Sequence, residues 1–283
     1  MGWWRAFHGQ AWWVRWSGKS GILALTILLV AYPYPTRLVT HMRRWQNPAA
    51  LINPDSPALT PLIDDLRDRI RADLPARKKL RIVEAYVYEK LPYAWDWDTW
   101  GVADYIPTVE EALEQGQEDC DGRAVVAASI LSAFGHKAEI VSDYAHVWVK
   151  TEAGETMSPG KRKSIVASDT GVRVHWRNLS DLFRATLFGW AAFPLHRELI
   201  VLVVLWLLIM APGTSWRWHA LIALLLVDAL LRLRVAGRDA HNPIVWLQGL
   251  ALFEAGVALF LGRIAARRAR SHFPAAPRVE TPA

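Results

Sequence analysis

Long apolar runs lie near both ends of the chain, and shorter periodic patterns lie between them. One run covers residues 21–31 after a tryptophan-rich stretch, and three more cover residues 199–211, 218–231 and 244–261. A helix needs about 20 apolar residues to cross a bilayer, and tryptophans at the headgroup level can extend a shorter run. The pattern predicts four membrane helices, one before and three after a soluble domain.

The middle of the chain changes its period once. Apolar residues at helical spacing predict helices over residues 60–74, 77–90, 108–114 and 120–134, the last one stopped by Gly135. Beyond Gly135 the period becomes two, which is typical of strands. Short strands are expected over residues 138–141, 146–151, 156–159, 164–167 and 172–176. Helices followed by an antiparallel meander predict an α+β domain.

These elements divide the chain into four parts. We expect an N-terminal membrane anchor with its juxtamembrane segment over residues 1–44 and an α+β domain over residues 45–180. A three-helix membrane region comes next, over residues 181–264, and then a Pro/Ala-rich, disordered tail over residues 265–283.

The formal net charge of +6 is unevenly distributed. Residues 1–35 carry +3, residues 36–197 carry −1 and residues 198–283 carry +4. Positive charge that flanks apolar runs is typical of membrane proteins and argues against a nucleic-acid-binding protein. The single cysteine excludes a disulfide scaffold.

The first apolar run is expected to be an uncleaved anchor, because Tyr32-Pro33-Tyr34-Pro35 offers no small-residue cleavage site. A short N-terminal anchor commonly exports the domain that comes after it, and the C-terminal segment 263–270 carries four arginines. We therefore expect a multi-pass membrane protein with its soluble domain outside the cytoplasm.

Two acids interrupt the C-terminal apolar runs. Asp228 has Arg232 four residues later, whereas Glu254 has no partner in its own run. An intramembrane acid either has a function or hydrogen-bonds a neighbouring helix, and the sequence leaves both interpretations open.

Cys120 is placed for nucleophilic chemistry. It is expected in the first turn of a helix, where backbone N–H groups and the helix dipole favour a thiolate. Asp119 and Asp121 act against this effect because their charges repel a thiolate. His146 begins a strand that can pack across the helix start and supply a base. A buried, inert cysteine is the alternative.

The surrounding motifs resemble a known superfamily. The stretch Val109-Glu110-Glu111-Ala112-Leu113-Glu114-Gln115-Gly116 leads into Glu118-Asp119-Cys120-Asp121, and Gly135-His136-Lys137-Ala138-Glu139 and His146-Val147-Trp148-Val149 lie further along the chain. Over about residues 77–160 the chain resembles the transglutaminase-like, papain-related cysteine superfamily. The resemblance implies that Cys120 is the nucleophile and His146 its general base, in acyl transfer through a thioester without a cofactor.

One position departs from the superfamily pattern. The usual third member is an aspartate before a proline, and Ser158 stands there, before Pro159. A serine can accept the imidazole N–H hydrogen bond, but it supplies no charge to stabilise an imidazolium. No metal site is predicted, because Cys120, His136, Asp143 and His146 lack zinc-site spacing.

The segment between residues 84 and 121 holds eleven acids and Lys90 as its only base. We expect a solvated acidic face, which could also favour basic substrates. Trp95, Trp97 and Trp100 in this segment are expected in the core or beside an acyl pocket.

Two functions from different classes fit the sequence. The first is a membrane-anchored enzyme that hydrolyses or transpeptidates an amide of a protein or peptide, using Cys120 and His146. The second is a non-catalytic membrane protein of the same fold that binds peptides or assembles with partners. The first needs a nucleophilic Cys120, and the second tolerates Cys120→Ala.

Overall fold

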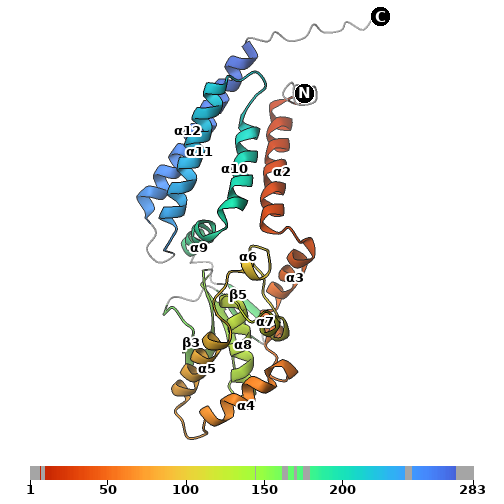
Figure 1. Cartoon of the computed structure of the whole chain (residues 1–283), viewed down its shortest axis with the longest axis vertical. Helices are drawn as coiled ribbons and strands as arrows, with labels where there is room; N and C mark the ends of the chain where they lie inside the picture. Colours follow the sequence, from red (N-terminus) through yellow and green to blue (C-terminus); the bar gives the residue numbers. More distant parts are fainter. Residues whose placement is uncertain are drawn as a thin grey trace, which may run out of the picture. The chain divides into compact units, whose positions relative to one another are not determined.

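The computed structural model describes residues 7, 10–143, 145–160, 165–168, 171–174, 179–239 and 244–271. The chain forms two compact units, one of residues 31–189 and one of residues 1–30 with 190–283 (Figure 1). We call them the mixed unit and the helical unit, and each is described by itself.

Helices make up the first part of the mixed unit. They are α3 (Pro35–Gln46), η1 (Pro48–Leu51), η2 (Pro57–Leu59), α4 (Thr60–Arg69), α5 (Ala76–Lys90), α6 (Asp96–Thr99), α7 (Val109–Gln115) and α8 (Cys120–Ala133). The predicted helices are confirmed as α4, α5, α7 and α8, although α4 ends before Leu74. The side chain of Thr108 and that of Glu111 form a capping box at α7, which ends on Gly116 in a left-handed conformation.

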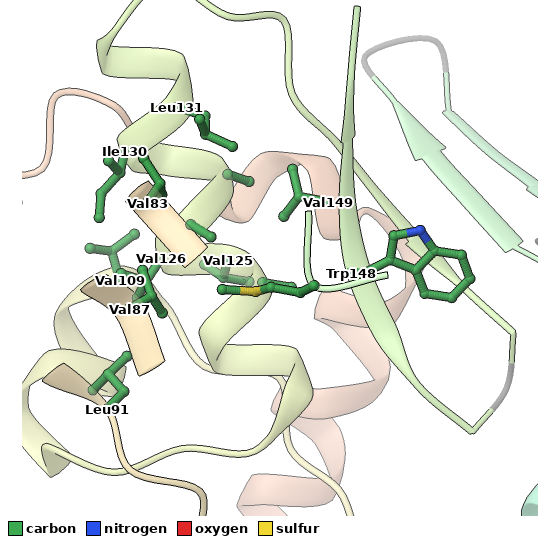
Figure 2. Packing of buried hydrophobic residues seen from close by; sticks show 14 of the residues in the cluster. Val83, Val87, Leu91, Val109, Val125, Val126, Ile130, Leu131, Trp148 and Val149 are labelled. Carbon is green, nitrogen blue, oxygen red and sulfur yellow. The ribbon is translucent and has the colours of Figure 1, made fainter. Parts of the chain in front are cut away.

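Helix α8 lies at the centre of the core. Ten of its fourteen residues are buried, so it is apolar on all sides rather than amphipathic. Val125, Val126 and Ile130 of α8 belong to the same apolar cluster as Val83 of α5 and Val149 of the sheet (Figure 2). This packing fixes the N-terminus of α8 against its neighbours.

Five antiparallel strands complete the mixed unit: β1 (Glu139–Ser142), β2 (Val147–Thr151), β3 (Gly154–Thr156), β4 (Ile165–Ser168) and β5 (Gly171–Val174). Four of the predicted strands overlap β1, β2, β4 and β5, whereas the strand predicted over residues 156–159 is wrong, because β3 shares only Thr156 with it. The strand order is β3-β2-β1-β4-β5, so the expectation of a simple meander was wrong. The third strand stops at Thr156 because Met157 is left-handed (φ 61°) and Pro159 has no N–H to donate. The chain then returns to the open edge of β1, where β4 pairs.

The helical unit contains α2 (Trp12–Ala31), α10 (Leu195–Ile209), α11 (Trp216–Ala236) and α12 (Val245–Ser271), and α9 (Leu179–Ala192) precedes α10. Within the described residues, α2 and α12 are long and apolar enough to cross a membrane. The segments 184–192 and 195–209 would add a third span if their 107° bend lies within one crossing. The four predicted spans therefore stay a prediction. They require α11 to cross the membrane in addition to these three. Residues 265–271, expected in a disordered tail, continue α12.

Ion pairs join the helices of this unit. Arg232 of α11 contacts Asp228 at 2.7 Å in its own helix and Glu254 of α12 at 3.1 Å. Glu254, which has no partner in its own run of residues, thus pairs with a cation of the neighbouring helix. Arg234 of α11 pairs in the same way with Glu198 of α10.

Candidate active site

Cys120 is the first residue of α8, as the sequence predicts, and it is partly buried. Asp119 is the N-cap residue, and its carboxylate accepts the N–H of Asp121 at 2.9 Å. The Cys120 thiol donates to the Asp121 carboxylate at 3.5 Å, and the backbone N–H of Val147, at the start of β2, acts to lower the pKa of the thiol. The strand after His146 therefore reaches the sulfur.

The loop before α8 is held by the segment that follows α5. Glu118 donates its backbone N–H to Pro92 (3.0 Å) and accepts that of Ala94 (3.2 Å), forming a parallel bridge between the two segments. Arg123, one turn into α8, donates to the carbonyl of Leu91 at 2.8 Å. These backbone contacts place Cys120 independently of its own side chain.

Gly122 makes room for a carboxylate beneath the helix. A Cβ at this position would lie 2.5 Å from the carboxyl group of Glu118, which is fully buried. Glu118 also accepts a hydrogen bond from the indole N–H of Trp100 at 2.9 Å. The glycine and the buried acid therefore depend on each other.

A buried acidic cluster surrounds the thiol, whereas Glu89, Asp98 and Glu114 of the same segment are exposed, as expected of a solvated face. Asp96 and Glu118 are 1% and 0% exposed, and Asp119 and Asp121 are also buried. Burial raises the pKa of Glu118 to about 8, with a further contribution from the charge of Asp119. Burial likewise raises the pKa of Asp96 and that of Asp121 well above the ordinary range. These groups tend to hold protons at neutral pH.

The same surroundings act on Cys120. Burial raises the pKa of its thiol well above the usual value, and the charges of Asp119 and Asp121 raise it further. The helix start and the Val147 N–H act in the other direction but are outweighed. The expected thiolate is thus replaced by a protonated thiol in the free protein.

His146 is oriented by a backbone carbonyl. Its ring Nε2 lies 2.9 Å from the carbonyl oxygen of Met157. A carbonyl only accepts, so Nε2 carries the proton and Nδ1 of the neutral ring has the lone pair that a general base needs. The buried Asp143 fixes the backbone on the other side by accepting the N–H groups of Ala145 (3.0 Å) and His146 (2.9 Å).

Ser158 faces another partner. Its hydroxyl donates to Glu155 at 2.7 Å, and Glu155 also accepts the indole N–H of Trp148 at 3.0 Å. Among the hydrogen bonds of the described residues, none joins Ser158 to the His146 ring and none joins that ring to the Cys120 sulfur. The Met157 carbonyl takes the orienting position that the sequence assigned to Ser158.

Two sets of ligand atoms lie close together near the thiol. Asp119, Cys120 and Asp121 form one set, and Asp96, Glu118 and Asp119 form the other, with all atoms of each within 4.8 Å of one another. The atoms of either set are close enough together to bind one cation or to share protons. Sequence reasoning missed Asp96 and Glu118, and the aromatic residues interleaved with the acids were the available signal of burial. His136 lies apart, paired with Glu152 at 2.6 Å.

No protein-family model, curated protein or solved structure matches this chain in sequence or structure comparisons. Its function is therefore inferred from the residues and contacts described above.

Proposed function

We propose that this chain is a membrane-anchored cysteine acyl-transfer enzyme of transglutaminase-like type. Cys120 is its nucleophile and His146 its general base, and an amide of a protein or peptide is its substrate. The observation that carries the proposal is the packing of α8, which begins with Cys120, against β2, which begins one residue after His146. This packing, together with the imidazole oriented by Met157, supports a site in which Cys120 and His146 act together.

The protonated thiol sets the order of events. Nδ1 of His146 takes the thiol proton while the sulfur forms a bond to the amide carbonyl carbon. Backbone N–H groups in the first turn of α8 have no partner within the helix and can donate to the resulting oxyanion. The imidazolium then gives its proton to the leaving amine as the C–N bond breaks, which leaves a thioester. Water or an amine attacks the thioester and restores the thiol.

The helical unit supplies the membrane anchor in this proposal. Helices α2 and α12 have the length and composition of spans. Helix α11 is 21 residues long, and Arg232 and Arg234 on it pair with acids. Paired charges cost less in a bilayer than isolated ones, which supports α11, and the bent α9–α10 pair, as the remaining two spans.

A non-catalytic, peptide-binding role is the second candidate. The observation that favours it is the buried acidic cluster, which raises the pKa of the thiol instead of activating it. In this role Cys120 is a small residue in the packed first turn of α8.

Acylation of Cys120 distinguishes the two candidates. Full-length protein in detergent is incubated with p-nitrophenyl acetate at pH 8, and a thioester that neutral hydroxylamine removes is detected by intact-mass spectrometry. We expect acetylation at Cys120, slowed at least about 100-fold by His146→Ala, the ordinary contribution of a general base. Ser158→Ala is the control and should acylate like the wild type. Acetylation that is indifferent to His146→Ala would establish the non-catalytic candidate.

A further inference from the structure

A cavity of about 490 Å³ lies within the helical unit. Its walls come from α2, α10 and α12. Leucines such as Leu23, Leu205 and Leu259 form its apolar part, and Trp12 and Trp16 line it as well. The cavity thus combines an apolar wall with tryptophans, which favour the headgroup level of a bilayer.

Four cations line the same cavity: Arg15 and Lys19 of α2, and Arg263 and Arg267 of α12. No acidic side chain is among the described residues that line it. Each pair is spaced four residues apart, so both cations of a pair lie on one face of their helix. Like charges at this spacing repel each other, and two such pairs here face one space. An anion in this cavity therefore faces positive charge from two helices.

We propose that this cavity binds the phosphate of an anionic phospholipid such as phosphatidylglycerol. The phosphate lies among the four cations, and an acyl chain runs along the leucines. Basic pockets between membrane helices are suited to anionic headgroups, because they add charge attraction to apolar contact. The inference rests on the proposed insertion of the helical unit in a membrane, but not on the acyl-transfer activity.

The close packing of α10 against α12 gives the cavity a defined wall. A Cβ at Gly262 would overlap the side chain of Ile209, so the glycine permits the two helices to approach. Both residues line the cavity. Two of the three helices that line the site are thus packed against each other there.

Lipid titration of the full chain tests the site. Protein in neutral detergent is titrated with short-chain phosphatidylglycerol, phosphatidylcholine or inorganic phosphate, and bound ligand is measured by native mass spectrometry. We expect phosphatidylglycerol to bind more tightly than phosphatidylcholine, with inorganic phosphate competing weakly. The double variant Arg263→Gln/Arg267→Gln should weaken phosphatidylglycerol binding about 30-fold, the effect of two headgroup cations.

Arg268→Gln is the matched control. This substitution removes a cation from the same helix. The Arg268 guanidinium lies over the Trp218 ring and does not line the cavity. Equal binding of the two lipids, or an equal loss in the control, would overturn the proposal. Full competition by inorganic phosphate would replace the lipid with a free phosphate ion. Alkaline carbonate extraction of the same proteins tests membrane insertion separately, so a failure of the anchor is distinguishable from a failure of the lipid site.

Discussion

The chemistry of Cys120 depends on which of its neighbours dominates. The α8 N-terminus and the Val147 N–H favour a thiolate, whereas burial and two adjacent carboxyl groups favour the thiol. The balance differs from that of a cysteine protease with a preformed ion pair. It predicts an enzyme whose thiol becomes nucleophilic only as its proton is taken.

Alkylation measures this balance. We expect the rate of reaction of Cys120 with iodoacetamide to rise with an inflection above the ordinary thiol pKa of about 8.5. Asp119→Asn should move the inflection to lower pH, because it removes a negative charge and keeps a good N-cap residue. Glu114→Gln, an exposed change on α7, should leave it unchanged. An inflection below pH 7 in the wild type would show that the helix start dominates.

Glu118 predicts a pH-dependent stability. Its pKa is raised from the ordinary 4.5 to about 8 in the folded state, so the folded protein binds more protons than the unfolded chain between these values. Its contribution is therefore fully present below about pH 4.5 and is lost as the pH rises to about 8, by at most about 1.4 kcal/mol per pH unit. Thermal unfolding of Glu118→Gln should depend less on pH over this range. Glu114→Gln should retain the wild-type dependence.

At the scale of the elements, Gly122 predicts a local steric effect. Gly122→Ala should destabilise the mixed unit by about 1–3 kcal/mol, because its Cβ meets the buried carboxyl of Glu118. Gly189→Ala is the matched change in α9, where a Cβ meets nothing within 4 Å. It should be neutral or stabilise by up to about 1 kcal/mol. Thermal unfolding of both variants checks the difference, and equal shifts would contradict it.

The elements that the sequence predicted are those with local signals. The α7 helix has a capping box and a terminal glycine, so its existence is a consequence of neighbouring residues. The pairing of β4 with β1 depends on contacts between distant segments, which no local pattern records. The position of Cys120 at a helix start was also predictable from a local signal, because Asp119 directly before it is a good N-cap residue.

Other parts of the candidate site leave no such signal. The group that orients His146 is the backbone carbonyl of Met157. Every residue has such a carbonyl, so the sequence does not mark the one that contacts the imidazole. The burial of Asp96 and Glu118 was concealed because eleven acids with one base resemble a solvated face. Glu254 has its partner on another helix, so its own run of residues could not reveal it.

At the scale of the whole molecule, the number of spans decides which side each end of the chain occupies. Four spans place both termini on one side and the mixed unit on the other, whereas three place the termini on opposite sides. The difference depends on α11, whose Asp228 and Arg232 form an ion pair at 2.7 Å. We expect this pairing to let α11 cross the bilayer.

The single cysteine makes the topology measurable in intact cells. In a Cys120→Ser background, Asp73→Cys lies between α4 and α5, and Thr281→Cys lies near the C-terminus. A membrane-impermeant maleimide should label Asp73→Cys from outside and Thr281→Cys only after lysis, as four spans with an exported mixed unit require. Labelling of both from outside would indicate an odd number of spans, because the C-terminus would then share a side with the mixed unit. Labelling of Thr281→Cys alone would contradict the export of the mixed unit, because the two positions would then lie on opposite sides with the mixed unit in the cytoplasm.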